Sequence, residues 1–374
     1  MGQWNEAKIG EIAEVKGGKR IPKGRKLIKE PNSHPYIRIR NLGKTKYMQL
    51  NTDYEYVDEE TQQMIARYIV NQGDILISVV GTIGLVGIVG NTLDKANQTE
   101  NCDKIINIKK VLSEYLYYYL VSSFGQDEIK KGTVGAVQPK LPLKNVKDII
   151  VKYPPIKEQK QIVEILSAID EKIELNETIN NNLEQQAQAI YQQMFIENQN
   201  PNWKEGKLSD LVAVKYGKDH KKLDGGCYPV YGSGGIMRYV EKPLYTGESV
   251  LIPRKGTLNN VMYVNGAFWS VDTMFYTEML RPNIAKFVYH FVKGKDLASL
   301  NAGSAVPSMT TNILNAMPLY VPDDETLSIF EETVTPMYSQ MQENEKQSAN
   351  LANIRDTLLP RLMSGELEVS DIDL

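Results

Sequence analysis

The stretch SVLIPRKGTLNNVMYV (249–264) holds residue types that can recognise a base pair. Arginine can donate two parallel hydrogen bonds to guanine, and asparagine can pair in a similar way with adenine. A turn between two strands would present such side chains together, so the stretch predicts a base-reading turn. Glycine, asparagine and proline also suit a tight turn for conformational reasons alone, and this alternative stays open. The residues concerned are Arg254, Lys255, Asn259 and Asn260.

A second glycine-punctuated stretch, YPVYGSGGI (228–236), comes shortly before that turn. Tyr231 and Ser233 stand beside its glycines, and we expect this loop to form the reading surface if the turn does not. We also expect a DNA contact by Lys218, at the end of LSDLVAVKYGK (208–218) on the N-terminal side of the loop.

Basic residues are concentrated near the N-terminus, although the whole chain has a net charge of only −3. Residues 15–52 hold eleven lysines and arginines against one acid, Glu30. A basic glycine-containing loop followed by a short strand suits phosphate clamping and base-edge reading, whereas a solvated basic face is the alternative. Residues 129–147 form a second, acid-free cluster with five lysines. From these clusters we expect DNA contacts by Lys19, Arg20, Lys23, Arg25, Lys26, Arg38, Arg40, Asn41, Lys131 and Lys140.

Patterns typical of catalytic and metal sites are missing from the sequence. The three histidines form no HExxH pattern, no GxxxxGK[ST] loop occurs, and GTIGLVG (81–87) departs from the dinucleotide fingerprint. YPPI (153–156) lacks the first residue of the Asn/Asp-Pro-Pro-Tyr run that amino-methyltransferases use. Cys102 and Cys227 have neither disulfide nor zinc spacing, and we expect two buried thiols in a reducing cytoplasm. The sequence therefore predicts a chain with no catalytic residue, metal or cofactor of its own.

The chain repeats itself. Residues 154–195 align without a gap on 322–363, at an offset of 168 positions. Near the start, IGEIAEVKGGK (9–19) matches LSDLVAVKYGK (208–218) at an offset of 199, and Gly81-Thr82 matches Gly256-Thr257 at an offset of 175. Each repeat therefore consists of a globular segment followed by a long helical one.

The two helical segments carry apolar residues at alternating spacings of four and three, which is typical of a coiled coil. Both apolar stripes are interrupted by polar residues at the same two central positions. If the helices pack antiparallel, Asn176 meets Ser348 and Asn180 meets Asn344, and such a polar layer would penalise slipped registers. A solvated gap between the helices is the alternative. Pro336 predicts a kink or a late start in the second helix.

These patterns predict an α+β fold with two mixed, β-rich globular domains, separated by two long antiparallel coiled-coil-like helices in a pseudo-two-fold repeat. The expected segments are 1–153, 154–200, 201–321 and 322–374, in the order domain, helix, domain, helix. Residues 75–93 carry no charge, but their glycines and β-branched residues favour two buried strands over a membrane span. No apolar-cored leader follows Met1, so we expect a cytoplasmic chain without a membrane anchor.

The whole chain resembles the specificity subunit of type I restriction–modification enzymes. The phrases that carry the resemblance are WNEAKIGEIAEVKGGK (4–19), YPPIKEQKQIVEILSAID (153–170), YPVYGSGGI (228–236), FWSVDTMFY (268–276) and RDTLLPRLMSGEL (355–367). The first half departs from the pattern, because its counterpart of YPVYGSGGI is the weaker YIRIRNL (36–42).

The resemblance implies a non-catalytic subunit that reads split double-stranded DNA with two target-recognition domains. It also implies that the helices dock two methyltransferase (M) subunits, which modify adenine N6, and that ATP-driven restriction (R) subunits complete the complex. S-adenosylmethionine, ATP and magnesium would then be bound by these partners. A coiled-coil DNA-binding regulator and a scaffold that binds only protein are the alternatives.

Overall fold

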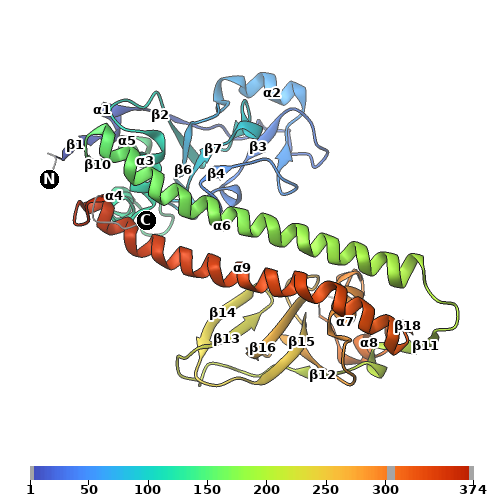
Figure 1. The fold of residues 1–374 in the computed structure, drawn as a ribbon. Coiled ribbons are helices and arrows are strands. Elements are labelled where there is room, and N and C mark those ends of the chain that lie inside the picture. The colour runs from blue at the N-terminus through green and yellow to red at the C-terminus, as the bar shows by residue number, and fades with distance from the viewer. Residues whose placement is uncertain (1–3, 301–307, 370–374) are drawn as a thin grey trace. The chain divides into compact units, whose positions relative to one another are not determined.

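The computed structural model of the chain describes residues 4–300 and 308–369. The chain divides into two compact units, which are unit 1 (Met1–Glu177 with Glu345–Leu374) and unit 2 (Thr178–Asn344). Two long helices, α6 (Ile156–Tyr191) and α9 (Asp324–Ser364), are drawn in green and red in Figure 1. Each of them contributes one part to each unit.

Unit 1 is built around a five-stranded sheet of order β2-β9-β6-β7-β4, with a three-stranded sheet β5-β3-β8 and a pair β1-β10. Its strands are β1 (Asn5–Lys8), β2 (Glu14–Gly17), β3 (Pro35–Ile37), β4 (Tyr47–Met48), β5 (Glu55–Tyr56), β6 (Ile75–Ser78), β7 (Val86–Val89), β8 (Asn97–Gln98), β9 (Cys102–Ile106) and β10 (Ile150–Tyr153). Its helices before α6 are α1 (Ile9–Ile12), η1 (Ile39–Asn41), α2 (Glu59–Ile65), η2 (Ala66–Tyr68), η3 (Asn91–Leu93), α3 (Ser113–Val121), α4 (Ser123–Gly132) and α5 (Leu143–Asp148).

Unit 2 is built around a six-stranded sheet of order β12-β17-β15-β16-β13-β14, with a pair β11-β18. Its strands are β11 (Lys204–Lys207), β12 (Val212–Tyr216), β13 (Tyr228–Gly232), β14 (Gly235–Val240), β15 (Tyr245–Pro253), β16 (Met262–Ser270), β17 (Met274–Met279) and β18 (Pro318–Val321). Its short helices are η4 (Gln192–Glu197), which continues α6 as a π-helix, η5 (Leu208–Asp210), α7 (Ala285–Lys293) and α8 (Thr311–Asn315).

The sequence repeat is also a repeat of strand pairing. In unit 1 the antiparallel β6–β9 register places Ile77 opposite Asp103. In unit 2 the antiparallel β15–β17 register places Ile252 opposite Phe275. Ile252 lies 175 positions after Ile77, the offset at which Gly81-Thr82 matches Gly256-Thr257. The order β2-β9-β6-β7 of unit 1 therefore corresponds to β12-β17-β15-β16 of unit 2.

The uncharged stretch 75–93 forms two buried strands, as predicted. Every residue of β6 and of β7 is buried. The two strands pair antiparallel in the middle of the five-stranded sheet, where both of their faces are covered. Such strands read as continuous apolar runs rather than as alternating patterns, which is why the stretch resembles a membrane span in composition alone. In the described residues no helix is both long and apolar enough to cross a membrane.

The helices pack into the cores of both units. In unit 1, Ile162 and Leu166 of α6 and Leu362 of α9 join the core formed by the sheet and α3. The Asp170 carboxylate of α6 accepts hydrogen bonds from Tyr118 (2.7 Å) and Arg355 (2.9 Å), which ties α3 and α9 to α6.

In unit 2, Tyr191 of α6 and Phe330 of α9 meet Phe287 of α7 in the core. The helix α9 begins at Asp324 and continues unbroken through Pro336, so the prediction of a late start was wrong. The buried neighbours Phe330 and Val334 anchor this segment, and their packing offsets the hydrogen bond that proline cannot donate.

The two cysteines differ in environment. Cys102 is fully buried on β9, and burial raises the pKa of its thiol to about 12. Cys227 is exposed, because the segment between β12 and β13 lies mostly at the surface. The prediction of two buried thiols was therefore wrong for Cys227.

Candidate nucleic-acid interface

Three segments meet beyond the end of β15 in unit 2. The β15–β16 turn (254–261) contacts the β13–β14 turn (233–234) through the Asn260 amide, which donates to the Ser233 carbonyl oxygen at 2.7 Å. The third segment begins at Ser308, which forms an antiparallel bridge with Lys255. The Met309 N–H also donates to the Arg254 carbonyl oxygen at 2.9 Å. The structure thus joins the two loops that the sequence offered as alternative reading surfaces.

The corresponding segments meet in unit 1. The turn after β6 forms a bridge between Val80 and Lys140, and the Leu141 N–H donates to the Val79 carbonyl oxygen at 2.8 Å. Val79 and Val80 lie 175 positions before Arg254 and Lys255. Lys140 and Leu141 lie 168 positions before Ser308 and Met309. A β-carbon added to Gly81 would lie 3.4 Å from Ile39, so this turn also touches the segment after β3. The same arrangement of loops is therefore present in both units, at the positions that the two repeat offsets relate.

Glycine is required at the same point of both turns. Gly81 has φ +76° and Gly256 has φ +85°, a left-handed conformation that residues with a β-carbon rarely adopt. The added β-carbon of Gly256 would also lie 3.0 Å from the Ser233 hydroxyl oxygen. The Gly-Thr match in the sequence is thus explained by backbone geometry and by a close approach between two loops.

The segments that follow β3 and β13 are equivalent, as the match of YIRIRNL to YPVYGSGGI suggests. The Thr99 N–H donates to the Ile37 carbonyl oxygen at 3.1 Å, and the Val271 N–H donates to the Tyr231 carbonyl oxygen at the same distance. Lys19 and Lys218 are placed alike, since their N–H groups donate to the carbonyl oxygens of the equivalent residues Gln98 and Ser270.

A buried tyrosine holds the start of the basic loop in unit 1. The Tyr36 hydroxyl donates to the Lys19 carbonyl oxygen at 2.9 Å. Burial raises the pKa of Tyr36 to about 12, so the hydroxyl stays protonated and able to donate in alkaline solution as well as at neutral pH. The Lys19 ammonium lies 5.7 Å from the ring centre of Tyr68.

The predicted readers of unit 2 have different roles in the structure. The Arg254 guanidinium lies over the exposed Tyr216 ring, with its central carbon 5.4 Å from the ring centre. Asn259 is bonded to Asp296 and Ala298, and Asn260 holds the two turns together as described above. Arg254 and the exposed Lys255 are therefore better placed than the two asparagines to contact a ligand. Tyr216 was missed by sequence reasoning, although it stands within the repeated phrase.

In unit 1, Arg38 and Arg40 follow β3 and share one carboxylate. The Glu55 Oε2 atom accepts from Arg38 Nη1 at 2.6 Å and from Arg40 Nη2 at 3.0 Å. The two arginine side chains are about half exposed nonetheless, at 45% for Arg38 and 52% for Arg40. Glu55 was missed by sequence reasoning, although the acid-rich stretch 53–60 directly follows the basic one.

Asn41 does not face the surface. The short strand expected after the basic loop ends at Ile37, and residues 39–41 form η1. The Asn41 side-chain oxygen accepts the Arg38 N–H at 2.8 Å, and the residue is buried. The prediction of an accessible Asn41 on a strand was therefore wrong, because the side chain closes the turn that presents the two arginines.

Acids from other segments offset much of the basic stretch. Arg20 pairs with Glu100 at 2.6 Å, and Arg25 pairs with Glu60 and lies 3.7 Å from Asp58. Lys131 pairs with Glu128 at 2.7 Å. Among the described residues, six of the predicted lysine contacts are exposed and show no ion pair, and these are Lys19, Lys23, Lys26, Lys140, Lys218 and Lys255.

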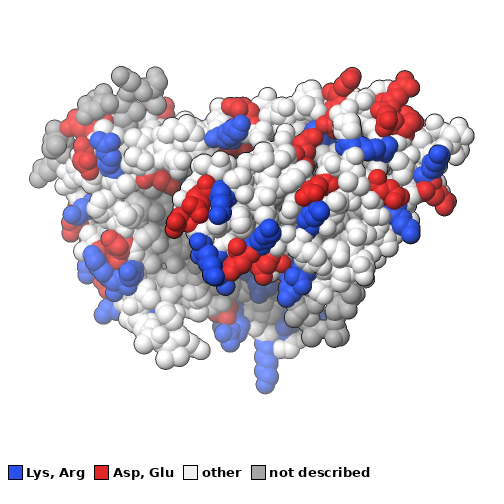
Figure 2. All heavy atoms as spheres, turned by 90° about the horizontal axis from the view of Figure 1, so that it is seen from below, with Lys and Arg blue, Asp and Glu red and all other residues white. Residues whose placement is uncertain are grey.

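On the face drawn in Figure 2, basic and acidic side chains alternate rather than forming one large basic patch. The lysines and arginines without a local acid are therefore the better candidates for phosphate contacts.

Both predicted polar helix contacts are present. In unit 1, Asn176 Nδ2 donates to the Ser348 hydroxyl at 3.2 Å and to Gln347 Oε1 at 2.9 Å. In unit 2, Asn344 Nδ2 donates to Asn180 Oδ1 at 2.7 Å. Whether these pairs fix the register of the helices stays a prediction.

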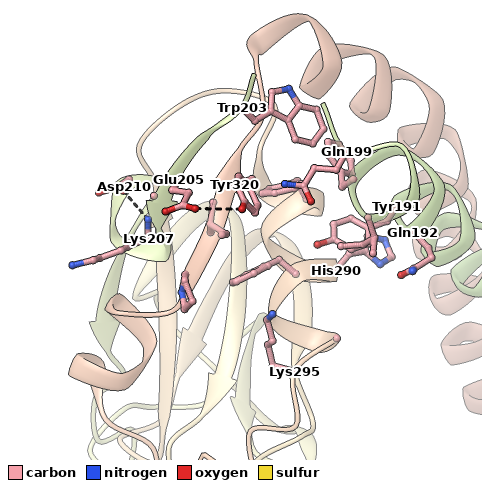
Figure 3. Close-up of a pocket in the computed structure, with 18 of the residues that line it drawn as sticks. Tyr191, Gln192, Gln199, Trp203, Glu205, Lys207, Asp210, His290, Lys295 and Tyr320 are labelled. Carbon is pink, nitrogen blue, oxygen red and sulfur yellow. Dashed lines mark hydrogen bonds between the residues drawn. The ribbon is translucent and has the colours of Figure 1, made fainter. Parts of the chain in front are cut away.

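A cavity of about 950 Å³ lies elsewhere in unit 2, between the end of α6 and the β11–β18 pair. Figure 3 shows Tyr191 and His290 on one side and Glu205, Lys207 and Tyr320 on the other. Its walls combine aromatic residues such as Phe195 and Trp203 with polar and charged ones, and none of the predicted DNA contacts lines it. In the described part of the chain, no group of three or more acidic, histidine or cysteine side chains is arranged to hold a metal ion.

The family model described as the type I restriction modification DNA specificity domain matches residues 1–185 and again residues 200–350. The chain belongs to this family. It is a specificity subunit, the DNA-recognising and non-catalytic component of a type I restriction–modification system. The two matches to one family model coincide with the two halves of the internal repeat.

Two curated relatives extend over nearly the whole chain. The type I restriction enzyme MjaIX specificity subunit of Methanocaldococcus jannaschii is 24% identical over 99% of this chain and 94% of its own length. The type I restriction enzyme HindI specificity subunit of Haemophilus influenzae is 21% identical over 98% of this chain and 100% of its own length. The crystal structure of the S subunit of a type I restriction–modification system from M. genitalium has the same fold, with a TM-score of 0.59, 19% identity and 96% coverage of both chains.

Proposed function

We propose that the chain reads a bipartite, asymmetric double-stranded DNA target, with one half-site read by each unit. In unit 1 the reading surface consists of the segments 38–42, 79–85 and 134–140. In unit 2 it consists of the segments 232–235, 254–261 and the residues from Ser308 onward.

The observation that carries this proposal is the duplicated loop arrangement with unlike side chains. Backbone contacts between the segments are conserved between the two units, from Val79–Leu141 to Arg254–Met309. The side chains they present differ, since Arg38 and Arg40 occupy the segment where unit 2 has Gly232 and Gly234. A constant scaffold with variable side chains is suited to reading two different sequences in the same way.

We further propose that the two helices dock two adenine-N6 methyltransferase (M) subunits and that restriction (R) subunits join this complex in the cytoplasm. The repeated helical segments support this assembly, because two similar surfaces on one chain suit two copies of one partner. S-adenosylmethionine, ATP and magnesium would be bound by these partners, since no motif for them occurs in this sequence.

Methylome sequencing of the source strain, with and without this gene, tests the proposal. We expect an N6-methyladenine motif made of two specified parts around an unspecified spacer, and its loss when the gene is deleted. An uninterrupted motif, or a methylome that deletion leaves unchanged, would contradict the proposal.

Biochemical reconstitution tests the division of labour. The purified chain alone should neither methylate nor cut DNA, whereas the chain with its M subunits should methylate the motif. As a control, exchanging segments 38–42, 79–85 and 134–140 for those of a relative should change only one part of the motif. A change in both parts would show that the two units do not read separately.

A further inference from the structure

Glu55 stands at the centre of the arginine pair in unit 1. Its Oε2 atom accepts from both guanidinium groups, and Arg40 Nη2 also donates to the Asp53 carbonyl oxygen at 2.9 Å. The Glu55 side chain is only 20% exposed, less than half the exposure of either arginine. The carboxylate therefore lies beneath the two guanidinium groups, and the arginines lie between it and solvent.

The backbone fixes the position of this carboxylate. Glu55 belongs to β5 and lies opposite Tyr36 in the antiparallel β3–β5 pair. Arg38 follows β3 by one residue, and the Asn41 side chain closes the turn from Arg38 to Asn41. Both the acceptor and its two donors are thus attached to the same small sheet, and neither depends on a mobile partner.

A shared carboxylate changes what an arginine does at a DNA surface. Each guanidinium has five N–H donors. Glu55 takes one from Arg38, whereas Glu55 and the Asp53 carbonyl oxygen together take both donors on Nη2 of Arg40. Arg38 therefore keeps four donors for a guanine edge, and Arg40 keeps those on Nε and Nη1. Fixing the guanidinium in advance reduces the conformational entropy lost on binding. The carboxylate also weakens the attraction of the same arginines for phosphate, which is the same in every DNA sequence.

We propose that Glu55 is a positioning residue, which presets Arg38 and Arg40 to read guanine in the half-site of unit 1 and disfavours their contact with phosphate. This inference rests on the proposed function. Ile39, which lies between the two arginines, touches the turn at Gly81, so the pair stands at the junction of the proposed reading segments.

The test uses the full-length chain assembled with its M subunits and a library of randomised duplexes, from which the preferred bases of each half-site are obtained. Glu55→Gln should bind scrambled DNA more tightly, with a salt dependence steeper by about one to two released counterions. Its preference within the half-site of unit 1 should fall by roughly tenfold. The half-site of unit 2 should be read as before and serves as the internal control.

Two further variants separate positioning from charge. Glu55→Asp keeps the charge but shortens the side chain, so the preference should fall without tighter binding to scrambled DNA. Glu59→Gln removes an equal charge from an exposed side chain that pairs with His34 and contacts neither arginine, so preference should be kept. Melting curves of each variant confirm that it is folded.

The outcomes distinguish the two proposals. Full preference in both folded Glu55 variants would overturn the positioning role, while leaving the proposed function intact. A wild-type complex with no preference in either half-site would overturn the proposed function itself.

Discussion

The Tyr338 hydroxyl of α9 lies 2.9 Å from Nε2 of His290 in α7, and both side chains are buried. The other ring nitrogen, Nδ1, lies 2.8 Å from Gln188 Oε1 of α6. Burial lowers the pKa of His290 to about 4, so the ring is neutral at neutral pH and has one N–H. Because Gln188 Oε1 can only accept, Nδ1 carries the proton and Nε2 accepts from Tyr338. A neutral histidine thus joins α7 to both long helices in unit 2.

Acid should destabilise unit 2 through His290. Above pH 6.5 neither the folded nor the unfolded state protonates this residue, so it adds no pH dependence. Between pH 6.5 and 4 only the unfolded state binds the proton, which removes about 1.4 kcal/mol of unfolding free energy per pH unit. The total loss is about 3 kcal/mol. Urea unfolding across this range measures it.

The matched variant is His290→Gln, whose amide can donate to Gln188 and accept from Tyr338 but does not titrate. Its unfolding free energy should depend less on pH between 6.5 and 4 than that of the wild type. If the unfolding free energies of the two proteins depend on pH in the same way, protonation of His290 does not destabilise the folded state, and the prediction is wrong.

Asp103 predicts the opposite trend in unit 1. The residue is buried on β9, and burial raises the pKa of its carboxyl to about 6 from 3.8. Because the folded state binds this proton more tightly than the unfolded state, protonation adds about 3 kcal/mol to the unfolding free energy below pH 3.8. This contribution is lost as the pH rises through 6. Asp103→Asn should therefore gain stability relative to the wild type as pH rises from 4 to 7. A stability difference that is constant with pH would contradict this account.

We expect the Asn180–Asn344 contact to lower the stability of the helix pair while fixing the register of the two helices. Replacing both residues with leucine should raise the unfolding free energy by about 1 kcal/mol, because the buried Asn344 and the half-buried Asn180 are exchanged for apolar side chains. The double variant should also recognise targets with an altered or less defined spacer, as measured by methylome sequencing. Each single variant should instead lose about 1 kcal/mol of unfolding free energy, because it removes the Asn344–Asn180 hydrogen bond without replacing both polar groups. Unchanged stability and spacer in the double variant would show that the pair does not set the register.

The repeat allowed much of the fold to be predicted. Residues that are 168, 175 or 199 positions apart in the repeat make equivalent hydrogen bonds in the two units. They do so because residues that match in the repeat take the same places in each sheet. The contact of Asn176 with Ser348 followed from the heptad spacing once antiparallel packing of the two helices was assumed.

Individual side chains at the candidate site could not be predicted in the same way. The charge run of residues 15–52 does not show that Glu55 lies beneath Arg38 and Arg40, since that contact depends on the pairing of β5 with β3. Asn41 and Asn260 have the residue type of a base reader, but a nearby backbone group binds each of them first. Composition identifies a surface, whereas partners distant in sequence decide which side chains are accessible.

The final prediction separates base reading from phosphate contact. Arg254 is held over Tyr216 at the turn of unit 2, whereas Lys23 and Lys26 are exposed in the basic loop of unit 1. Arg254→Ala should cost about 1–3 kcal/mol on the cognate duplex and relax only the second half-site. Lys23→Ala or Lys26→Ala should weaken binding to all sequences and lower the salt slope by about one.

Affinities of the M-bound complex, measured for cognate duplexes and for duplexes scrambled in each half-site at several salt concentrations, distinguish the two roles. Tyr216→Leu is the matched control, because it removes the ring under Arg254 while keeping the guanidinium. If Arg254 reads a base from a fixed position, this variant should lose preference in the second half-site with no change in salt slope, since no charge is lost. Equal weakening of cognate and scrambled duplexes by Arg254→Ala would instead make this arginine a phosphate contact. The base-reading role would then pass to the loop of Tyr231 and Ser233, which Asn260 holds beside the same turn.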